Sequence, residues 1–151
     1  MSLRDMKLTP LKQDILERAA RVRHAHAVVN ETFLLRDKGP SYRKAWQDAC
    51  SAFHEYAGDA FAPYRDDLKA DLAEGRPEAI EFALSFLECR PYYYRSGYLY
   101  RNILRWVKRL PMSQLQAKRR DLILACYAEY RAGAAQGHFT TGGMDDMIDG
   151  T

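Results

Sequence analysis

The residues best suited to bind an anionic partner are concentrated between Cys89 and Arg120, a stretch that we call the basic segment. It contains nine arginine or lysine residues and no aspartate or glutamate, whereas the residues before it carry thirteen basic and fifteen acidic side chains. Half of the ten tyrosines lie in the same stretch. Positive charge interleaved with aromatic rings is typical of surfaces that bind phosphates, carboxylates or acidic side chains. The basic residues are Arg90, Arg95, Arg101, Arg105, Lys108, Arg109, Lys118, Arg119 and Arg120.

Arg95, Ser96 and Gly97 form the clearest candidate for an anion site, at the start of a predicted helix. A planar guanidinium can bind two oxygen atoms at once, and a glycine allows a ligand to approach the backbone. Ser96 and the first free N–H groups of the helix would add further donors. The alternative is a capped helix start whose arginine packs on Tyr92 or Tyr94, because such caps are common.

The tyrosines before this helix and the cations along it extend the candidate surface. Three consecutive tyrosines, Tyr92 to Tyr94, cannot all point into a core, so at least one should be exposed. Exposed tyrosine beside arginine is typical of protein interfaces and of base-stacking surfaces. The alternative for the cations is a solvated face whose long side chains cover apolar surface. The candidate binding residues are Tyr94, Arg95, Ser96, Gly97, Tyr98, Arg101, Arg105 and Lys108.

Metal and catalytic chemistry find little support in the sequence. His24 and His26 are two residues apart, so they point to different sides of a helix. His54 lacks the second histidine of a His-Glu-x-x-His motif, because Gly58 occupies that position. Cys89 has arginines nearby but ends an apolar helix, which favours an inert buried thiol. We therefore expect no catalytic residue, no metal site and no cofactor.

Helical periodicity dominates the first half of the chain. Thr9 and Pro10 predict the start of a first helix, whose apolar residues recur at three- and four-residue spacing. Ser41 is expected to cap a second helix that runs toward Gly58. A third, more polar helix is expected after Pro63, with Tyr64, Leu68 and Leu72 on its apolar side. A fourth, from about Pro77 to Pro91, is apolar nearly all round, which predicts a central position.

Two further helices are expected in the second half of the chain. Ser96 is predicted to cap the fifth, which runs to about Arg109, and Ser113 to cap the sixth, which stops near Gly133. On the fifth helix, Arg101, Arg105 and Lys108 are expected on the face opposite its apolar residues. Those residues are Leu99, Ile103, Trp106 and Leu110. The sixth helix is expected to bury Leu115, Leu122, Ile123, Cys126, Tyr127 and Tyr130.

These patterns predict an all-α protein of about six helices in antiparallel hairpins, arranged as a bundle or in HEAT-like stacks. Period-two alternation never persists long enough to predict a strand. The turn from Pro91 to Tyr98, followed by the basic helix, resembles a set of uncharacterised bacterial helical proteins. These share a Pro-aromatic-Arg-Ser-Gly-Tyr turn ahead of a basic helix. The resemblance covers residues near 87–110 and implies no activity.

The overall composition indicates one folded domain over residues 1–132 and a flexible acidic tail over 133–151. The chain has 151 residues, of which 47% are hydrophobic and 28% charged, values typical of a folded domain. Its three cysteines are far apart and odd in number, which predicts free thiols in the cytoplasm. No apolar run approaches the roughly 20 residues that a membrane span needs, so we expect no membrane partner.

Three functions fit these observations. The first is a non-catalytic interaction module that binds an acidic protein segment through the basic, tyrosine-rich surface around the fifth helix. The acidic tail, from the same chain or from a second copy in a homo-oligomer, is one candidate ligand. The second is nucleic-acid binding through the same surface, although a net charge of +3 is modest for that role. The third is an enzyme that acts on an anionic metabolite near Arg95.

Overall fold

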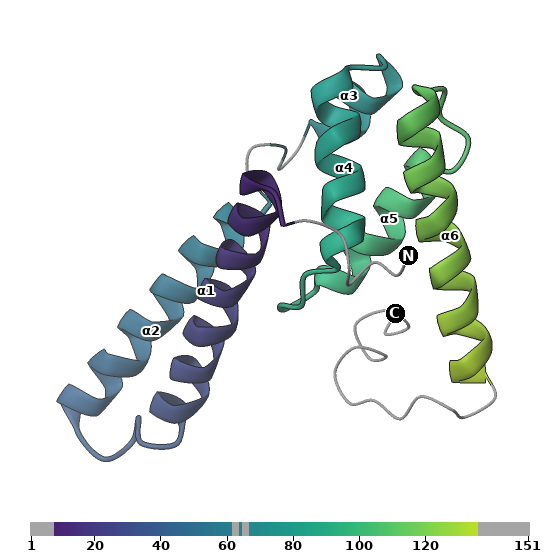
Figure 1. Cartoon of the computed structure of the whole chain (residues 1–151). Helices are drawn as coiled ribbons and strands as arrows, with labels where there is room; N and C mark the ends of the chain where they lie inside the picture. The colour runs from purple at the N-terminus through teal and green to yellow at the C-terminus, as the bar shows by residue number, and fades with distance from the viewer. Residues whose placement is uncertain (1–7, 62–63, 65–66, 136–151) are drawn as a thin grey trace.

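The computed structural model describes residues 8–61, 64 and 67–135, and within them it contains six α-helices and no strand (Figure 1). The predicted all-α fold is therefore confirmed. The expected tail lies almost wholly outside the described residues, and the last helix continues two residues beyond Gly133. The helices are α1 (Pro10–Phe33), α2 (Pro40–Asp59), α3 (Leu68–Ala73), α4 (Pro77–Cys89), α5 (Ser96–Val107) and α6 (Gln114–Ala135).

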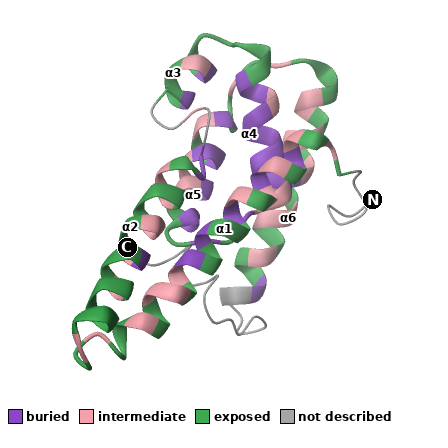
Figure 2. Ribbon diagram, turned by 90° about the vertical axis from the view of Figure 1, so that its left-hand side faces the viewer, coloured by how far each residue is buried: buried purple, intermediate pink, exposed green. Residues whose placement is uncertain are grey.

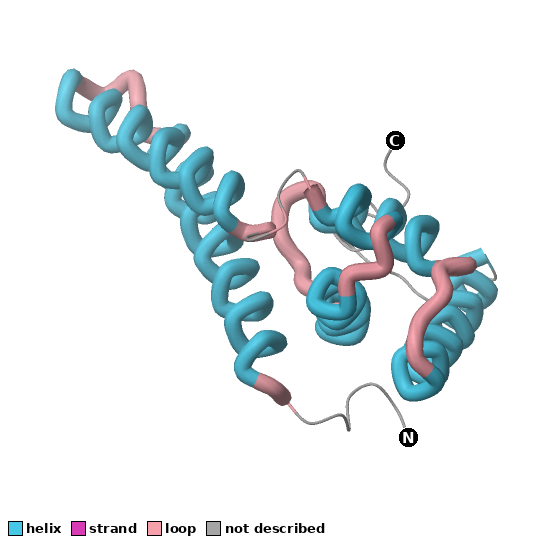
Figure 3. Tube along the Cα trace, turned by 90° about the horizontal axis from the view of Figure 1, so that it is seen from above, coloured by secondary structure: helices cyan, strands magenta, loops and turns pink. Residues whose placement is uncertain are grey.

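The α1 and α2 helices form an antiparallel hairpin that extends away from the other four helices (Figures 1 and 3). The start of α1 is as predicted: the Thr9 side chain accepts a hydrogen bond from the Lys12 N–H at 3.2 Å, and Pro10 is the first helical residue. The predicted Ser41 cap of α2 is wrong. The helix begins at Pro40, two residues before the start that a Ser41 cap implies, with Gly39 at the cap position and no side-chain cap bond.

The α4 helix is the centre of the structure, as its composition predicted. It contacts α1, α3, α5 and α6, and almost every residue from Ala79 to Glu88 is buried (Figure 2). Phe86 and Phe82 also pack against Phe61, which follows α2, with ring centroids 5.2 and 5.4 Å apart. These contacts connect the base of the hairpin to the bundle.

The short α3 helix begins later than expected. It starts at Leu68 rather than just after Pro63, and Tyr64 packs against the core from outside any helix. Leu68 and Leu72 are each 1% exposed, as predicted, because one helical turn separates them and both face α4 and α5.

The α5 and α6 helices start in different ways. Ser113 caps α6 as predicted: its hydroxyl accepts the Gln116 N–H at 3.2 Å, while the Gln116 side chain accepts the Ser113 N–H. Ser96 does not cap α5. It is the first residue of the helix, and Arg95 occupies the cap position in a left-handed conformation.

The α6 helix buries Ile123 as expected but not Leu115, which is 75% exposed. Leu115 lies in the first turn of the helix, one residue after its start. Leu122, Cys126, Tyr127 and Tyr130 are half-buried rather than fully buried.

An ion-pair cluster joins α1, α4 and α6. The Glu88 carboxylate accepts hydrogen bonds from Arg119 at 2.6 and 3.1 Å, and the Lys12 ammonium lies 3.1 Å from it. Arg119 also pairs with Glu81, about two turns earlier on α4. Burial alone would raise the pKa of the Glu88 carboxyl, but the hydrogen bonds from Arg119 and Lys12 hold that pKa below its usual value.

Removing the buried charge of this cluster should destabilise the fold. Glu88→Gln leaves Lys12 and Arg119 without their shared carboxylate, which should cost about 3–5 kcal/mol at neutral pH. Because the pKa of Glu88 is lower in the folded than in the unfolded chain, its contribution is present above about pH 4.5 and is lost as the pH falls through the folded value. Urea unfolding of both proteins from pH 7 to pH 3 should therefore show the difference shrinking with acid; a constant difference would contradict this.

The two faces of α5 should respond differently to substitution. Ile103 is fully buried, so Ile103→Ala should lower the free energy of unfolding by about 2–5 kcal/mol. Arg105 is exposed, so Arg105→Glu should change it by no more than about 0.5 kcal/mol. Chemical denaturation monitored by circular dichroism measures both, and an unfolded Arg105→Glu variant would overturn the assignment of faces.

Candidate functional site

The turn between α4 and α5 presents two tyrosines to solvent and buries the one between them. Tyr92 and Tyr94 are 39% and 44% exposed, whereas Tyr93 is 4% exposed. The Ser96 hydroxyl, itself buried, accepts the Tyr93 N–H at 3.1 Å and so fixes the turn. The expectation that at least one of the three tyrosines is exposed is confirmed.

Two arginines in left-handed conformations bracket this turn. Arg90 has φ 45° and Arg95 has φ 66°, values that cost a residue with a side chain about 1–2 kcal/mol each. The Arg90 guanidinium lies over the ring of Tyr130 at 4.2 Å and that of Tyr100 at 5.2 Å. Its Nε and Nη2 atoms are buried and have no hydrogen-bond acceptor among the described residues, so the two rings supply its main stabilising contact.

Three of the nine cations of the basic segment are half-buried and make their contacts within the fold. Arg90 stacks on tyrosine rings, and Arg119 pairs with two glutamates. Arg120 donates a hydrogen bond to the Leu110 carbonyl oxygen at 2.7 Å, just after α5 ends. The interpretation of the whole basic segment as a surface was too broad, because these partners are distant in sequence and only packing brings them together.

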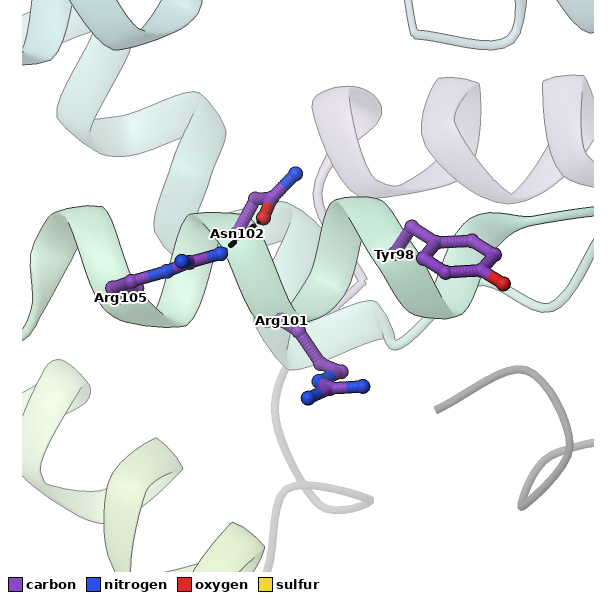
Figure 4. A pocket seen from close by; sticks show the side chains of 4 residues that line it. All are labelled: Tyr98, Arg101, Asn102 and Arg105. Atoms are coloured by element: carbon purple, nitrogen blue, oxygen red, sulfur yellow. Dashed lines mark hydrogen bonds between the residues drawn. The ribbon is translucent and has the colours of Figure 1, made fainter. Parts of the chain in front are cut away.

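Four side chains along α5 line an open cavity of about 430 Å³, which we call the arginine cleft (Figure 4). They are Tyr98, Arg101, Asn102 and Arg105, which lie on successive turns of the helix at spacings of three, one and three residues. Arg105 and Tyr98 are exposed and Arg101 is half-buried. The Arg105 guanidinium donates to the Asn102 side-chain oxygen, which holds it at the rim of the cleft.

A second concavity of about 510 Å³, which we call the aromatic groove, lies between α2 and the start of α5. Phe53 and His54 line it from α2, and Tyr94, Arg95 and Tyr98 from the turn and α5. The Tyr94 ring packs 5.5 Å from Phe53, and the Arg95 guanidinium lies 5.3 Å from the Tyr94 ring. Tyr98 lines both concavities, so the groove and the cleft adjoin.

The structure brings together most, but not all, of the predicted binding residues. Tyr94, Arg95 and Tyr98 line the groove, and Tyr98, Arg101 and Arg105 line the cleft. Lys108 is exposed one turn beyond Arg105 and lines neither. Ser96 and Gly97 are buried, and the Ser96 hydroxyl serves the turn rather than an exposed helix start.

Sequence reasoning missed the contributions of Asn102 and of α2. Asn102 could have been found from its position four residues after Tyr98 and three before Arg105, which places all three on neighbouring turns. Phe53 and His54 carried no such signal. They lie about forty residues earlier in the chain, and only the packing of Phe53 on Tyr94 brings them to the site.

Burial raises the pKa values of three groups in and around the turn between α4 and α5. Burial raises the pKa of the Cys89 thiol to about 11, although Lys12 opposes this shift. Burial likewise raises the pKa of Tyr100 to about 12, and it raises that of Tyr93 further. The residues that line the arginine cleft and the aromatic groove supply cations, hydrogen-bond donors and rings, a composition suited to binding an anion.

Comparisons with protein-family models, curated proteins and solved structures find no match to this chain. The resemblance of the Pro91–Tyr98 turn to bacterial helical proteins thus stays a prediction. Among the described residues, no three histidine, cysteine or acidic side chains lie close enough together to hold a metal ion. None of the described helices is both long and apolar enough to cross a bilayer.

Cys89 should react slowly with alkylating agents in the folded protein. Its raised pKa leaves little thiolate at pH 8, and the thiolate is the reactive species. Iodoacetamide labelling followed by peptide mass spectrometry should leave Cys89 largely unmodified in buffer and fully modified in guanidinium chloride. Rapid labelling in buffer would show an activated cysteine and would contradict the inert-thiol interpretation.

Proposed function

We propose that this protein is a non-catalytic helical interaction module that binds an acidic protein segment across the arginine cleft and the aromatic groove. The observation that carries the proposal is the placement of Arg101 and Arg105 one helical turn apart, beside the exposed Tyr98, in an open cavity. Two guanidinium groups at this spacing can each bind a carboxylate from a passing chain.

The adjoining aromatic groove favours a polypeptide over a free anion. Exposed tyrosine and arginine side chains are the residue types enriched at the energetic centres of protein interfaces. Tyr94 and Arg95 supply them on one side of Tyr98, and Arg101 and Arg105 on the other. A small anion would contact only the cleft, whereas a chain with both apolar and acidic side chains can contact both concavities.

The distribution of the cations favours an acidic protein over nucleic acid. Duplex binding rests on many phosphate contacts spread along a surface. Three of the nine cations in the basic segment are bound within the fold, and the net charge of the chain is +3. The arginine cleft concentrates its charge over one turn of α5, which matches a short run of carboxylates.

Reversing the two charges of the cleft should abolish binding to an acidic peptide. The variant R101E/R105E should bind a short labelled peptide of alternating glutamate and leucine at least about tenfold more weakly, because each charge-assisted hydrogen bond contributes about 1.5–3 kcal/mol. Fluorescence anisotropy measures the affinity. Binding by the wild type should also weaken as salt rises, since exposed charges are screened beyond about 8 Å at physiological ionic strength.

The variant K38E/K69E is the matched control, because it changes the net charge equally at two exposed lysines outside the site. It should keep nearly the affinity of the wild type. Equal peptide binding by R101E/R105E and the wild type would reduce the cleft to a solvated face. Titrations with labelled duplex DNA and single-stranded RNA complete the comparison: tighter, R101E/R105E-sensitive binding to either would favour the nucleic-acid function instead.

A further inference from the structure

The two adjoining concavities together define the pattern that their ligand must carry. The aromatic groove accepts large apolar side chains, and the arginine cleft accepts carboxylates. Arg95, at the cap position of α5, precedes Arg105 by ten residues, which corresponds to about 15 Å along the helix axis. An extended segment of about five or six residues covers that length. The ligand should therefore be a short strip in which apolar and acidic residues are mixed.

The chain contains such a segment near its own C-terminus. Residues 144–149 read Met-Asp-Asp-Met-Ile-Asp, with three carboxylates and three large apolar side chains. The sequence after Arg120 has a single basic residue, Arg131. We propose that residues 144–149 of the same chain occupy the arginine cleft and the aromatic groove and compete there with the external partner. This inference rests on the proposed function and names a built-in ligand for the same site.

The end of α6 lies close enough to α5 for this segment to reach the site. The Tyr127 ring is 5.7 Å from the ring of Tyr100, which precedes Arg101 in sequence. From Tyr127 to Ala135 the helix advances by about 12 Å. The nine further residues to Met144 can span up to about 30 Å when extended. The chain can thus return from Ala135 to Arg101 with length to spare.

Charge and tethering both favour this occupancy. Asp145, Asp146 and Asp149 carry three negative charges, and Arg95, Arg101 and Arg105 carry three positive ones. A tethered segment also has an effective concentration in the millimolar range, so a weak intrinsic affinity suffices for it to occupy the site. An external acidic partner must displace it, which makes the segment an autoinhibitory competitor.

Limited proteolysis of the full-length chain tests this proposal. Thermolysin cleaves before large apolar residues, so it can cut at Met147 and Ile148, and intact-mass spectrometry reports the rate. We expect the wild-type tail to be cut at least about tenfold more slowly than that of R101E/R105E. The control K38E/K69E should match the wild type. The charge-swapped variant R101E/R105E/D145K/D146K should regain protection, because it restores opposite charges with the positions exchanged.

Equal cleavage of the wild type and R101E/R105E, with the helical circular dichroism spectrum of both intact, would overturn the inference. So would protection that appears only as the protein concentration rises, because it would assign the segment to a second copy. The variant D145N/D146N/D149N should bind the glutamate–leucine peptide several-fold more tightly than the wild type, since its internal competitor is weakened. If the peptide binds in an Arg101- and Arg105-dependent way but the tail is cut equally in both proteins, the proposed function stands and this inference alone fails.

Discussion

The packing of α4 imposes the main constraint on this structure. Its residues from Ala79 to Glu88 are buried almost without interruption, so no face of the helix can be left to water. Covering it takes α1, α3, α5 and α6, and these contacts fix the positions of the first and last helices. Glu88, the residue before the end of this helix, is also buried, and its carboxylate needs a cation beside it. Lys12 and Arg119, which are far apart in the sequence, both form ion pairs with it.

This requirement explains why the basic segment does not behave as one surface. The arginines that α4 and its neighbours recruit are Arg90, Arg119 and Arg120, which lie at the two ends of the segment. In the middle of the segment, Arg105 and Lys108 are exposed along α5 and Arg101 is half-buried beside them. The candidate surface is thus the part of the segment that lies away from α4. Its position follows from the packing, and not from the count of charges alone.

Much of the fold could be predicted from the sequence because helix periodicity and capping are local properties. The starts of α1, α4 and α6 follow from Thr9 with Pro10, from Pro77 and from Ser113. The wrong prediction at Ser96 concerns a residue with two suitable local roles. Ser96 could cap a helix or accept the Tyr93 N–H, and the tertiary position of the turn selects the second. Local spacing places Tyr98, Arg101 and Arg105 on neighbouring turns of α5, but the groove with Phe53 depends on a long-range contact that no local pattern encodes.

The turn between α4 and α5 connects the core to the candidate site. Its two left-handed arginines are unfavourable in isolation, and the contacts around them must offset that cost. On the core side of the turn, the stacking of the Arg90 side chain on Tyr100 and Tyr130 offsets this cost. On the outside, Arg95 covers Tyr94, and Tyr94 packs on Phe53 and on His26. Tyr94 is thereby held against the hairpin while it remains exposed. The groove is therefore supported by α1, α2 and α5 at once, and such support lowers the free-energy cost of ordering side chains on binding.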